Sequence, residues 1–362
     1  MAHYRKKCIS LLLTTQCNLD CKYCYSKKDR KENFSLNIDF AKRGIEDFFK
    51  ISEKKHIRYF GTGEPTLKFP IIRKVNDFAR SLVGEDLLSE IQTNGVFSNE
   101  IANWLSKNID IIWISLDGIP EINDQVRVFP NGDGSSKVVL KNIKTILESK
   151  RKPFVGIRAT ITPLNLFRQI ELVKFASDLG VKVVYSDPIF PQVGKNEIDC
   201  LKIKEDFYLK YAKEYLKAYK FANNHDLFYG SIFTVNFDEK TNIFCRSCIP
   251  CPHLTPDGYV SNCDMATLKD ALPDLIYGKW EAARKEIEYF PEKIARIKNR
   301  TVENLETCSD CEIKYNCAGA CFGEGFNETG KFLGVKNSYC EAIRFLAKNM
   351  PLNFGLSPFL HP

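Results

Sequence analysis

The chain has 362 residues, 44% of them hydrophobic, which is enough to bury one large core and a smaller second domain. It contains no apolar run of the roughly 18 residues that span a membrane, and its N-terminus is polar and basic, so we expect a cytoplasmic protein with no membrane span and no secretory signal. The net charge of +7 is spread along the chain, which favours a Lys-rich surface or an acidic peptide partner and gives no motif for nucleic acid.

Short apolar runs alternate with segments of helical periodicity in the first half of the chain. The runs that we expect to be strands lie at 8–13, 57–60, 88–92, 111–116, 154–161 and 181–185. The segments that we expect to be helices lie at 39–49, 71–82, 100–105, 138–147 and 166–179. This order predicts an α/β fold with a parallel sheet and right-handed crossovers, in which ligands bind at the C-terminal ends of the strands.

Three cysteines follow the first apolar run, and they are the most informative feature of the sequence. Cys17, Cys21 and Cys24 have the spacing C-x3-C-x2-C. Three thiolates on one loop can hold three irons of a four-iron cluster and leave the fourth iron open to a ligand that is not protein, which indicates chemistry rather than electron storage. A zinc loop or a set of unrelated buried cysteines is the alternative.

A second motif, Gly61-Thr62-Gly63-Glu64-Pro65, follows the second apolar run. Together with the cysteine spacing and with Tyr23 just before the last cysteine, it resembles the radical S-adenosylmethionine enzymes, whose open iron is chelated by the methionine moiety. The segment is similar to their Gly-Gly-Glu-Pro loop, from which Thr62 departs. The resemblance implies that this loop approaches S-adenosylmethionine and that Glu64 accepts a hydrogen bond from its ammonium group.

The ends of later strands carry further candidate contacts for this cofactor. Gln92, Asn94 and Ser115 resemble family positions near the ribose, although Asn-Gly and Asp-Gly are also ordinary turn dipeptides. Arg158 lies among apolar residues on the fifth strand, where a charge needs a partner. The cofactor carboxylate and a carboxylate on a neighbouring strand are the two alternatives for Arg158.

A long aromatic helix is expected at 204–223, after a Pro-rich and Gly-containing segment. Its tyrosines recur at three and four residues and therefore share one face; they are Tyr208, Tyr211, Tyr215 and Tyr219. We interpret this face as packing against the barrel rather than as a track for substrate.

The last third of the chain is rich in cysteine, and the whole chain has 14. The regular spacing C-x2-C-x5-C-x3-C comprises Cys308, Cys311, Cys317 and Cys321, and Cys340 follows. Cys263 stands five residues after Gly258, and three more thiols precede it at Cys245, Cys248 and Cys251. Because a reducing cytosol disfavours disulfides, this number of cysteines argues for metal ligation.

This pattern resembles the SPASM extension of peptide-modifying radical S-adenosylmethionine enzymes, which carries two auxiliary four-iron clusters. The resemblance implies that Cys263 and Cys321 join two of the three upstream cysteines, and it leaves open which two. Cys308, Cys311, Cys317 and Cys340 would hold the other cluster. Zinc is the competing occupant, and Cys8 and Cys200 fit no motif and are interpreted as ordinary buried residues.

The resemblance divides the chain into four parts. A partial (β/α)6 TIM-like barrel would span 5–190, a linker and bridging helix 191–240, a cysteine-rich SPASM domain that binds auxiliary iron-sulfur clusters 241–350, and a tail 351–362. The implied cofactors are S-adenosylmethionine and three 4Fe-4S clusters. A reducing partner such as flavodoxin or ferredoxin would supply electrons.

The function implied is oxidative modification of a ribosomally made precursor peptide through a 5′-deoxyadenosyl radical, with a thioether or carbon-carbon crosslink as product. Oxidation of a sulfatase residue to formylglycine is the alternative, and a non-catalytic iron-sulfur or zinc protein is the alternative of another class. By analogy with the sulfatase-maturing members, Asp264 is the candidate base; surface solvation or a bond to the cluster loop is its other interpretation. The first strand begins near the N-terminus, so we expect the core or a separate leader-binding protein to recognise the precursor.

Overall fold

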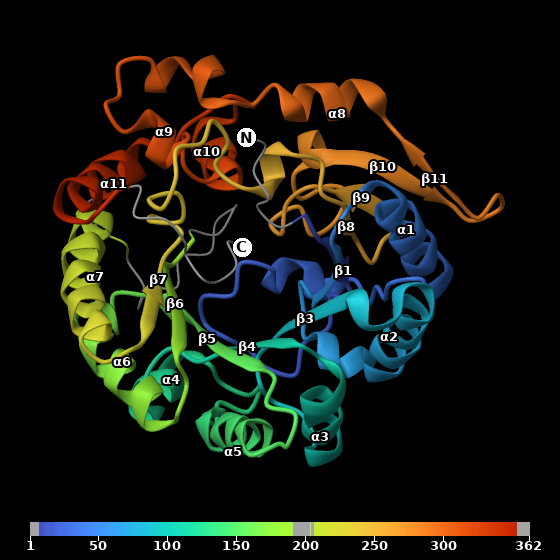
Figure 1. The fold of residues 1–362 in the computed structure, drawn as a ribbon, viewed down its shortest axis with the longest axis horizontal. Helices are drawn as coiled ribbons and strands as arrows, with labels where there is room; N and C mark the ends of the chain where they lie inside the picture. The colour runs from blue at the N-terminus through green and yellow to red at the C-terminus, as the bar shows by residue number, and fades with distance from the viewer. Residues whose placement is uncertain (1–6, 191–202, 204–205, 353–362) are drawn as a thin grey trace.

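A single sheet organises the molecule, and the computed structural model describes it over residues 7–190, 203 and 206–352. Within those residues the strand order is β11-β10-β9-β8-β1-β2-β3-β4-β5-β6-β7. Figure 1 shows the sheet curving around the centre of the molecule with helices on its outer side. The α/β fold with a parallel, barrel-like sheet is confirmed.

The parallel part of the sheet runs from β1 to β7 in chain order. Its strands are β1 (Ile9–Leu12), β2 (Lys55–Phe60), β3 (Leu87–Thr93), β4 (Ile111–Ser115), β5 (Phe154–Ile161), β6 (Val183–Pro188) and β7 (Phe228–Gly230). The first six match the apolar runs of the sequence. The seventh has three residues and pairs in parallel with β6, and such a short strand has too few residues for its periodicity to show.

The helices of this part cover the outer face of the sheet (Figure 1). They are α1 (Ile38–Ile51), α2 (Phe69–Val83), α3 (Asn99–Asn108), α4 (Pro120–Val126), α5 (Ser136–Leu147), α6 (Gln169–Asp178) and α7 (Phe207–Asn223). In α1 the buried side chains recur at helical spacing, for example Phe40, Ile45 and Phe48, and the side chain of Asn37 caps the helix by accepting from the Phe40 N–H. Amphipathic helices of this kind bury one face against a sheet.

The C-terminal part continues the same sheet from its other edge. Residues of β8 (His253–Leu254) pair in parallel with β1, with Ser10 opposite His253. Beyond it β9 (Tyr259–Ser261), β10 (Ile276–Glu281) and β11 (Glu286–Tyr289) form an antiparallel meander. The C-terminal helices are α8 (Pro291–Lys298), α9 (Lys314–Cys317), α10 (Phe322–Thr329) and α11 (Asn337–Asn349).

The helix α7 connects the two parts, because it packs against β7 and α6 on one side and α11 on the other. It begins at Phe207, slightly later than the sequence predicts. Tyr208, Tyr211 and Tyr215 are buried on its inner face. The expectation that the tyrosine face packs against the barrel is confirmed for Tyr211 and Tyr215, which contact Ser186 of β6 and Tyr229 of β7, whereas Tyr208 packs against Tyr339 of α11.

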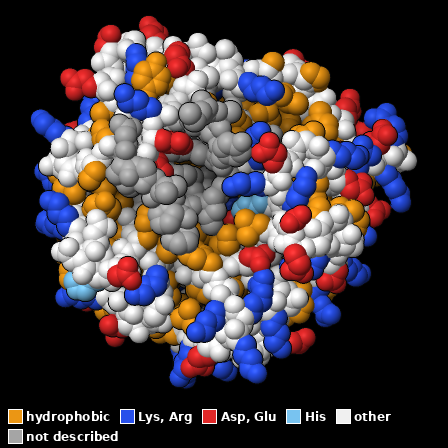
Figure 2. Space-filling model, in the orientation of Figure 1, with side chains coloured by type: hydrophobic (Ala, Val, Ile, Leu, Met, Phe, Trp, Pro, Cys, Tyr) orange, Lys and Arg blue, Asp and Glu red, His pale blue; other side chains and the backbone are white. Residues whose placement is uncertain are grey.

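Two further observations concern the surface. Within the described ranges, no helix is both long enough and apolar enough to cross a bilayer. Figure 2 shows Lys and Arg side chains interspersed with Asp and Glu around the rim of the face that it presents.

Candidate active site

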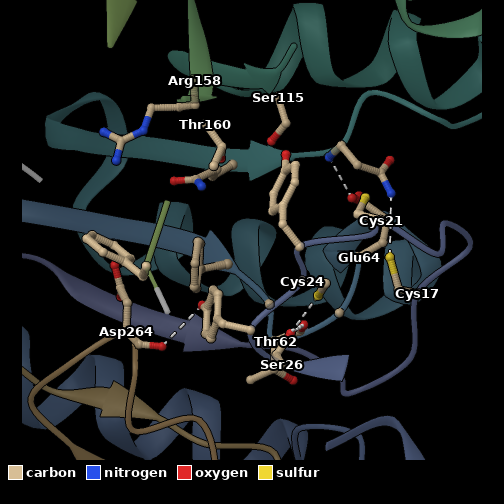
Figure 3. Close-up of a pocket in the computed structure, with 18 of the residues that line it drawn as sticks. Cys17, Cys21, Cys24, Ser26, Thr62, Glu64, Ser115, Arg158, Thr160 and Asp264 are labelled. Atoms are coloured by element: carbon tan, nitrogen blue, oxygen red, sulfur yellow. Dashed lines mark hydrogen bonds between the residues drawn. The ribbon is translucent and has the colours of Figure 1, made fainter. Parts of the chain in front are cut away.

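One cavity of about 260 Å³ lies at the C-terminal ends of the parallel strands. Figure 3 shows the three cysteines of the first loop on one side of it, and Arg158 and Asp264 toward the other. The cavity is lined by most of the proposed cofactor contacts: Tyr23, Gly61, Gly63, Glu64, Gln92, Asn94, Ser115 and Arg158. Pro65 is the exception: it is buried at the start of a short 3-10 helix, Pro65–Lys68, and is not among the lining residues.

Cys17, Cys21 and Cys24 line this cavity together. Burial raises the pKa of the Cys21 thiol to about 12, a rise that Arg127 opposes and the neighbouring Cys24 and Cys17 reinforce. Burial raises the pKa of Cys17 in the same way. Thiols that keep their protons in the absence of a metal release these protons when they bind one. Three soft sulfur donors facing one cavity fit an iron-sulfur cluster.

Polar side chains donate to two of these sulfurs. The Arg30 guanidinium donates from Nη2 to Cys24 Sγ at 3.3 Å, and the Asn94 amide donates from Nδ2 to Cys17 Sγ at 3.7 Å. Arg30 belongs to the 3-10 helix Lys27–Lys31, which follows the cysteine loop. Such donors stabilise thiolate charge. The sequence analysis did not single out Arg30, although it stands only six residues after Cys24.

The 61–65 loop is locked against the cysteine loop by its backbone. The N–H of Gly63 donates to the Thr14 carbonyl at 3.0 Å, and the N–H of Glu64 donates to the Gln16 carbonyl at 2.8 Å. A Cβ on Gly63 would lie 1.9 Å from the Gln16 oxygen, so only glycine permits this approach. Thr62, which departs from the family pattern, keeps the loop in place by donating from Oγ1 to the Thr14 carbonyl at 3.1 Å.

Glu64 is 1% exposed and its carboxylate is largely used inside the protein. Oε1 accepts from the Thr93 hydroxyl at 2.6 Å and from both the N–H and the hydroxyl of Thr66. Oε2 accepts from the Asn94 N–H at 2.7 Å. Burial raises the pKa of Glu64 against the effect of these hydrogen bonds. One acceptor position remains on Oε2, so the contact with the cofactor ammonium stays a prediction.

A buried charge pair supports the aromatic residue of the cysteine loop. Tyr23 donates to Asp117 Oδ2 at 2.5 Å, and Arg127 donates from Nε to the same oxygen at 2.9 Å. The Arg127 guanidinium also lies 5.4 Å from the centre of the Tyr23 ring. Ser115, two residues before Asp117, faces the cavity. Arg127 lies in a loop without a motif, so the sequence analysis did not identify it.

Arg158 has the strand partner that the sequence analysis gave as one of its two alternatives. Its Nη2 lies 2.9 Å from Asp187 Oδ2 on the neighbouring strand β6. Asp187 is held in turn because its Oδ1 accepts from the Ile232 N–H at 2.7 Å. Arg158 still lines the cavity, so a contact with the cofactor carboxylate stays a prediction.

Asp264 lies at the edge of the cavity, directly after Cys263. Arg58 donates to both of its oxygens from Nη1 at 3.0 Å, and His253 Nε2 lies 2.9 Å from Oδ1. A second guanidinium, that of Arg246, lies 3.4 Å from Oδ2. Burial alone would raise the pKa of Asp264, but Arg58 and His253 hold it well below its usual range. A carboxylate held in this way is a weak proton acceptor, and the geometry makes Asp264 an ion-pair partner between β2 and the loop after β9.

The first C-terminal set of cysteines brings Cys245, Cys263 and Cys321 together from three distant segments. Burial raises the pKa of Cys321 well above its usual value, and Cys263 and Cys245 raise it further. The pKa of Cys245 is likewise raised by burial and by the neighbouring Cys248 and Cys263. Cys251, by contrast, lies beside Cys8. Of the three upstream cysteines, Cys245 therefore lies near Cys263 and Cys321, and Cys248 lies beside Cys245.

The second set consists of Cys308, Cys311, Cys317 and Cys340, which line one narrow cavity. Burial raises the pKa of Cys317 to about 12, and Cys340, Cys308 and Cys311 contribute to the rise. Four thiols from the segment 308–317 and from α11 thus face one another. This donor set fits a four-iron cluster.

The remaining cysteines have no such grouping in the described part of the chain. Cys8 is buried, as expected, and accepts a hydrogen bond from Arg246 Nη1 at 2.8 Å. Cys200 lies outside the described residues. All thirteen cysteines in the described ranges are free thiols, and no three His, Cys, Asp or Glu side chains there are arranged to hold a single metal ion.

Comparison with known proteins identifies the family to which the barrel residues are similar. Residues 11–176 match the model of the Radical SAM superfamily. An uncharacterized protein of Methanocaldococcus jannaschii is 35% identical over 188 residues, which are 51% of this chain and 64% of that protein. A cysteine-type anaerobic sulfatase-maturating enzyme of Clostridium novyi is 29% identical over 39% of this chain and 41% of its own length. The chain thus spans about half the length of these curated relatives.

Two solved structures share the fold over nearly the whole chain. The structure of anSMEcpe with bound AdoMet and the Cp18Cys peptide covers 94% of this chain and 96% of its own, with a TM-score of 0.74 and 18% identity. Streptococcus suis SuiB bound to the precursor peptide SuiA covers 93% of this chain and 76% of its own, with a TM-score of 0.66 and 18% identity. Together with the cysteine-rich C-terminal part, the chain has the same overall fold as these two structures. Residues 11–176 are a radical SAM domain.

Proposed function

We propose that this protein is a radical S-adenosylmethionine enzyme that oxidatively modifies a peptide by forming a crosslink. The observation that carries the proposal is the cysteine content of the cavity. Cys17, Cys21 and Cys24 line it, and among the described lining residues there is no fourth cysteine. Three ligands leave a four-iron cluster with one iron for S-adenosylmethionine.

When bound, a reduced cluster and S-adenosylmethionine supply a radical that abstracts hydrogen from a substrate. The chain itself orients and shields this chemistry. Arg30 and Asn94 stabilise the thiolate charge of Cys24 and Cys17. Arg158 presents a cationic group, fixed by Asp187, to the same cavity, where it would hold the cofactor carboxylate.

Two auxiliary clusters would accept the electron that remains on the substrate during its oxidation. We assign Cys245, Cys248, Cys263 and Cys321 to one of them. Cys308, Cys311, Cys317 and Cys340 would hold the other. The first set is close to the cavity, because Asp264, which follows Cys263 directly, lines it.

A peptide substrate is supported by the fold, since anSMEcpe and SuiB both share it and were solved with bound peptides. The state of Asp264 favours crosslinking over formylglycine formation. In the formylglycine alternative Asp264 would accept a proton, yet here both of its carboxylate oxygens accept hydrogen bonds from Arg58 at 3.0 Å, and His253 Nε2 lies 2.9 Å from one of them.

Incubation under anaerobic conditions with S-adenosylmethionine, dithionite and candidate peptides tests the proposal. The peptides are the short products encoded beside the gene and a synthetic sulfatase-type peptide that contains cysteine. Crosslinking is expected to lower the mass of a peptide encoded beside the gene by two hydrogen atoms, while the peptide keeps its sulfur. Mass spectrometry measures this change. The Cys24→Ala variant is the matched control and should leave every peptide unchanged.

Two other results would contradict the proposal. Replacement of the cysteine sulfur in the sulfatase-type peptide by a hydrazine-reactive aldehyde would establish the formylglycine alternative. Formation of 5′-deoxyadenosine with no change in any peptide would point to a substrate that is not a peptide.

A further inference from the structure

Arg300 follows helix α8 and is among the largest fully buried side chains of the described part, with 1% exposure. Its Nε donates to the Phe332 carbonyl at 3.3 Å, and its Nη2 donates to the Gly334 carbonyl at 3.0 Å. The guanidinium lies 4.4 Å from the centre of the Phe322 ring. Its third nitrogen, Nη1, is buried and has no hydrogen-bond partner.

The unpaired nitrogen lies next to the second set of cysteines. A Cβ built on Gly319 would be 3.9 Å from Arg300 Nη1. Gly319 lines the same narrow cavity as Cys308, Cys311, Cys317 and Cys340. The buried donor is therefore close to the wall of the cavity that the four sulfurs share.

The charge of Arg300 also lacks a compensating group. Among the described residues, no carboxylate oxygen lies within 4.0 Å of its guanidinium nitrogens, the distance that defines an ion pair. Burying an unpaired charge is costly, and proteins avoid it by placing an opposite charge nearby. Four thiolates that hold a four-iron cluster form a negatively charged group, which would compensate the buried charge of Arg300.

We propose that Arg300 donates a hydrogen bond from Nη1 to the iron-sulfur cluster held by Cys308, Cys311, Cys317 and Cys340, and that its charge raises the reduction potential of that cluster. The proposal rests on the proposed function, in that it requires a cluster at these cysteines. Hydrogen bonds to the sulfurs and nearby positive charge both stabilise the reduced, more negative form of a cluster. Arg300 is thus a positioning residue that makes this cluster a better electron acceptor.

The reduction potential itself is the property to measure. Potentiometric titration followed by electron paramagnetic resonance is best carried out in a Cys17→Ala, Cys21→Ala, Cys24→Ala background, where only the auxiliary clusters contribute. In that background Arg300→Gln should decrease the reduced-to-oxidised ratio of one cluster at least tenfold at a fixed potential, which is a fall of about 59 mV for a one-electron couple. Arg300→Lys, which keeps the charge, should restore most of the ratio.

Arg296 provides a matched control one helical turn earlier. Its guanidinium lies 4.3 Å from the centre of the Phe332 ring, but it is paired with Asp274 at the surface. Arg296→Gln removes the same charge from the same region and should leave both potentials unchanged. Equal potentials in the parent, Arg300→Gln and Arg296→Gln proteins would overturn the proposal.

A second measurement avoids the loss of structure that a buried substitution can cause. In protein with the native Arg300, labelled with 15N-arginine, electron-nuclear double resonance should detect a nitrogen coupled to the reduced cluster. The coupling should persist in Arg344→Gln, which removes the exposed arginine that also lines this cavity. Absence of any coupling in the native protein would overturn the proposal.

Failure of the inference can be told apart from failure of the proposed function. If Cys308→Ala and Cys340→Ala variants retain all the iron of the parent, no cluster exists at this site and the inference fails, while radical chemistry at Cys17, Cys21 and Cys24 is unaffected. If the wild type forms no 5′-deoxyadenosine, the proposed function fails, while the potential shift remains measurable.

Discussion

Cys248 and Cys251 are only three residues apart, yet their surroundings differ. Cys248 lies beside Cys245, which in turn lies near Cys263, whereas Cys251 lies beside Cys8, the residue before β1. Cys248→Ala should therefore remove about four irons from the reconstituted protein, and Cys251→Ala should remove none. Iron counting after anaerobic reconstitution checks this, and equal iron loss in the two variants would contradict our assignment.

Gly63 shows a different kind of residue-scale constraint. Because a Cβ there would meet the Gln16 oxygen at 1.9 Å, Gly63→Ala must displace the backbone just before Cys17. We expect the substitution to cost about 1–3 kcal/mol of stability and to weaken iron retention at the first loop. Iron content and thermal unfolding of the reconstituted variant measure both effects.

Gly84→Ala is the control for Gly63→Ala. It also places a Cβ on a glycine, with a positive φ of 59°, but nothing lies within 4 Å of that Cβ. It should lower stability slightly and leave the iron content unchanged. Full iron and normal cleavage of S-adenosylmethionine in Gly63→Ala would show that the close approach of the two loops is not required.

Residue spacing predicted the cysteine groups, but not the side chains that support them. The spacing of Cys308, Cys311 and Cys317 is local, so it can be read in the sequence. Arg127 and Arg300 act through contacts with residues that the fold brings near, and nothing in their neighbouring sequence indicates this. The environment of Asp264 is of the same kind, since Arg58 is 206 residues away along the chain.

At the scale of elements, α7 joins the barrel to the C-terminal part. Tyr211 on its inner face donates to the Ser186 carbonyl at 2.5 Å and accepts from the Ser231 hydroxyl at 2.6 Å. Tyr211→Phe leaves the buried Ser186 carbonyl without this donor and the buried Ser231 hydroxyl without this acceptor, so it should cost about 1–3 kcal/mol in the free energy of unfolding. Denaturant titration of the purified variant measures this cost.

Tyr219→Phe, on the same helix, is the matched control for Tyr211→Phe. Tyr219 is only partly buried and stacks on Tyr215 at 6.3 Å between ring centres. Its substitution should change stability little. A loss as large as that of Tyr211→Phe would contradict the assignment of that cost to the buried hydrogen bonds of Tyr211.

The elements that the sequence predicted are those with clear periodicity. All six apolar runs became parallel strands, because each is long enough to show its buried pattern. β7 and β8 have three and two residues, and their place in the sheet depends on pairing with β6 and β1. Such short strands acquire their identity from their neighbours, so the continuity of the sheet could not be predicted.

At the scale of the whole molecule, the continuous sheet places the cysteine-rich part next to the barrel cavity. The pairing of β8 with β1 brings the loop that carries Cys263 and Asp264 to the cavity edge. Arg58 on β2 then connects the barrel to this loop through Asp264. This arrangement would put an electron acceptor beside the place where a substrate is oxidised.

The most direct test of this account is the formation of 5′-deoxyadenosine by anaerobically reconstituted protein with dithionite, together with its iron content. We predict about twelve irons and 5′-deoxyadenosine in the wild type. The Cys17→Ala, Cys21→Ala, Cys24→Ala variant should keep about eight irons and form no 5′-deoxyadenosine. Zinc in place of iron, or no 5′-deoxyadenosine from a wild type that contains its full iron, would contradict radical chemistry at the three-cysteine loop.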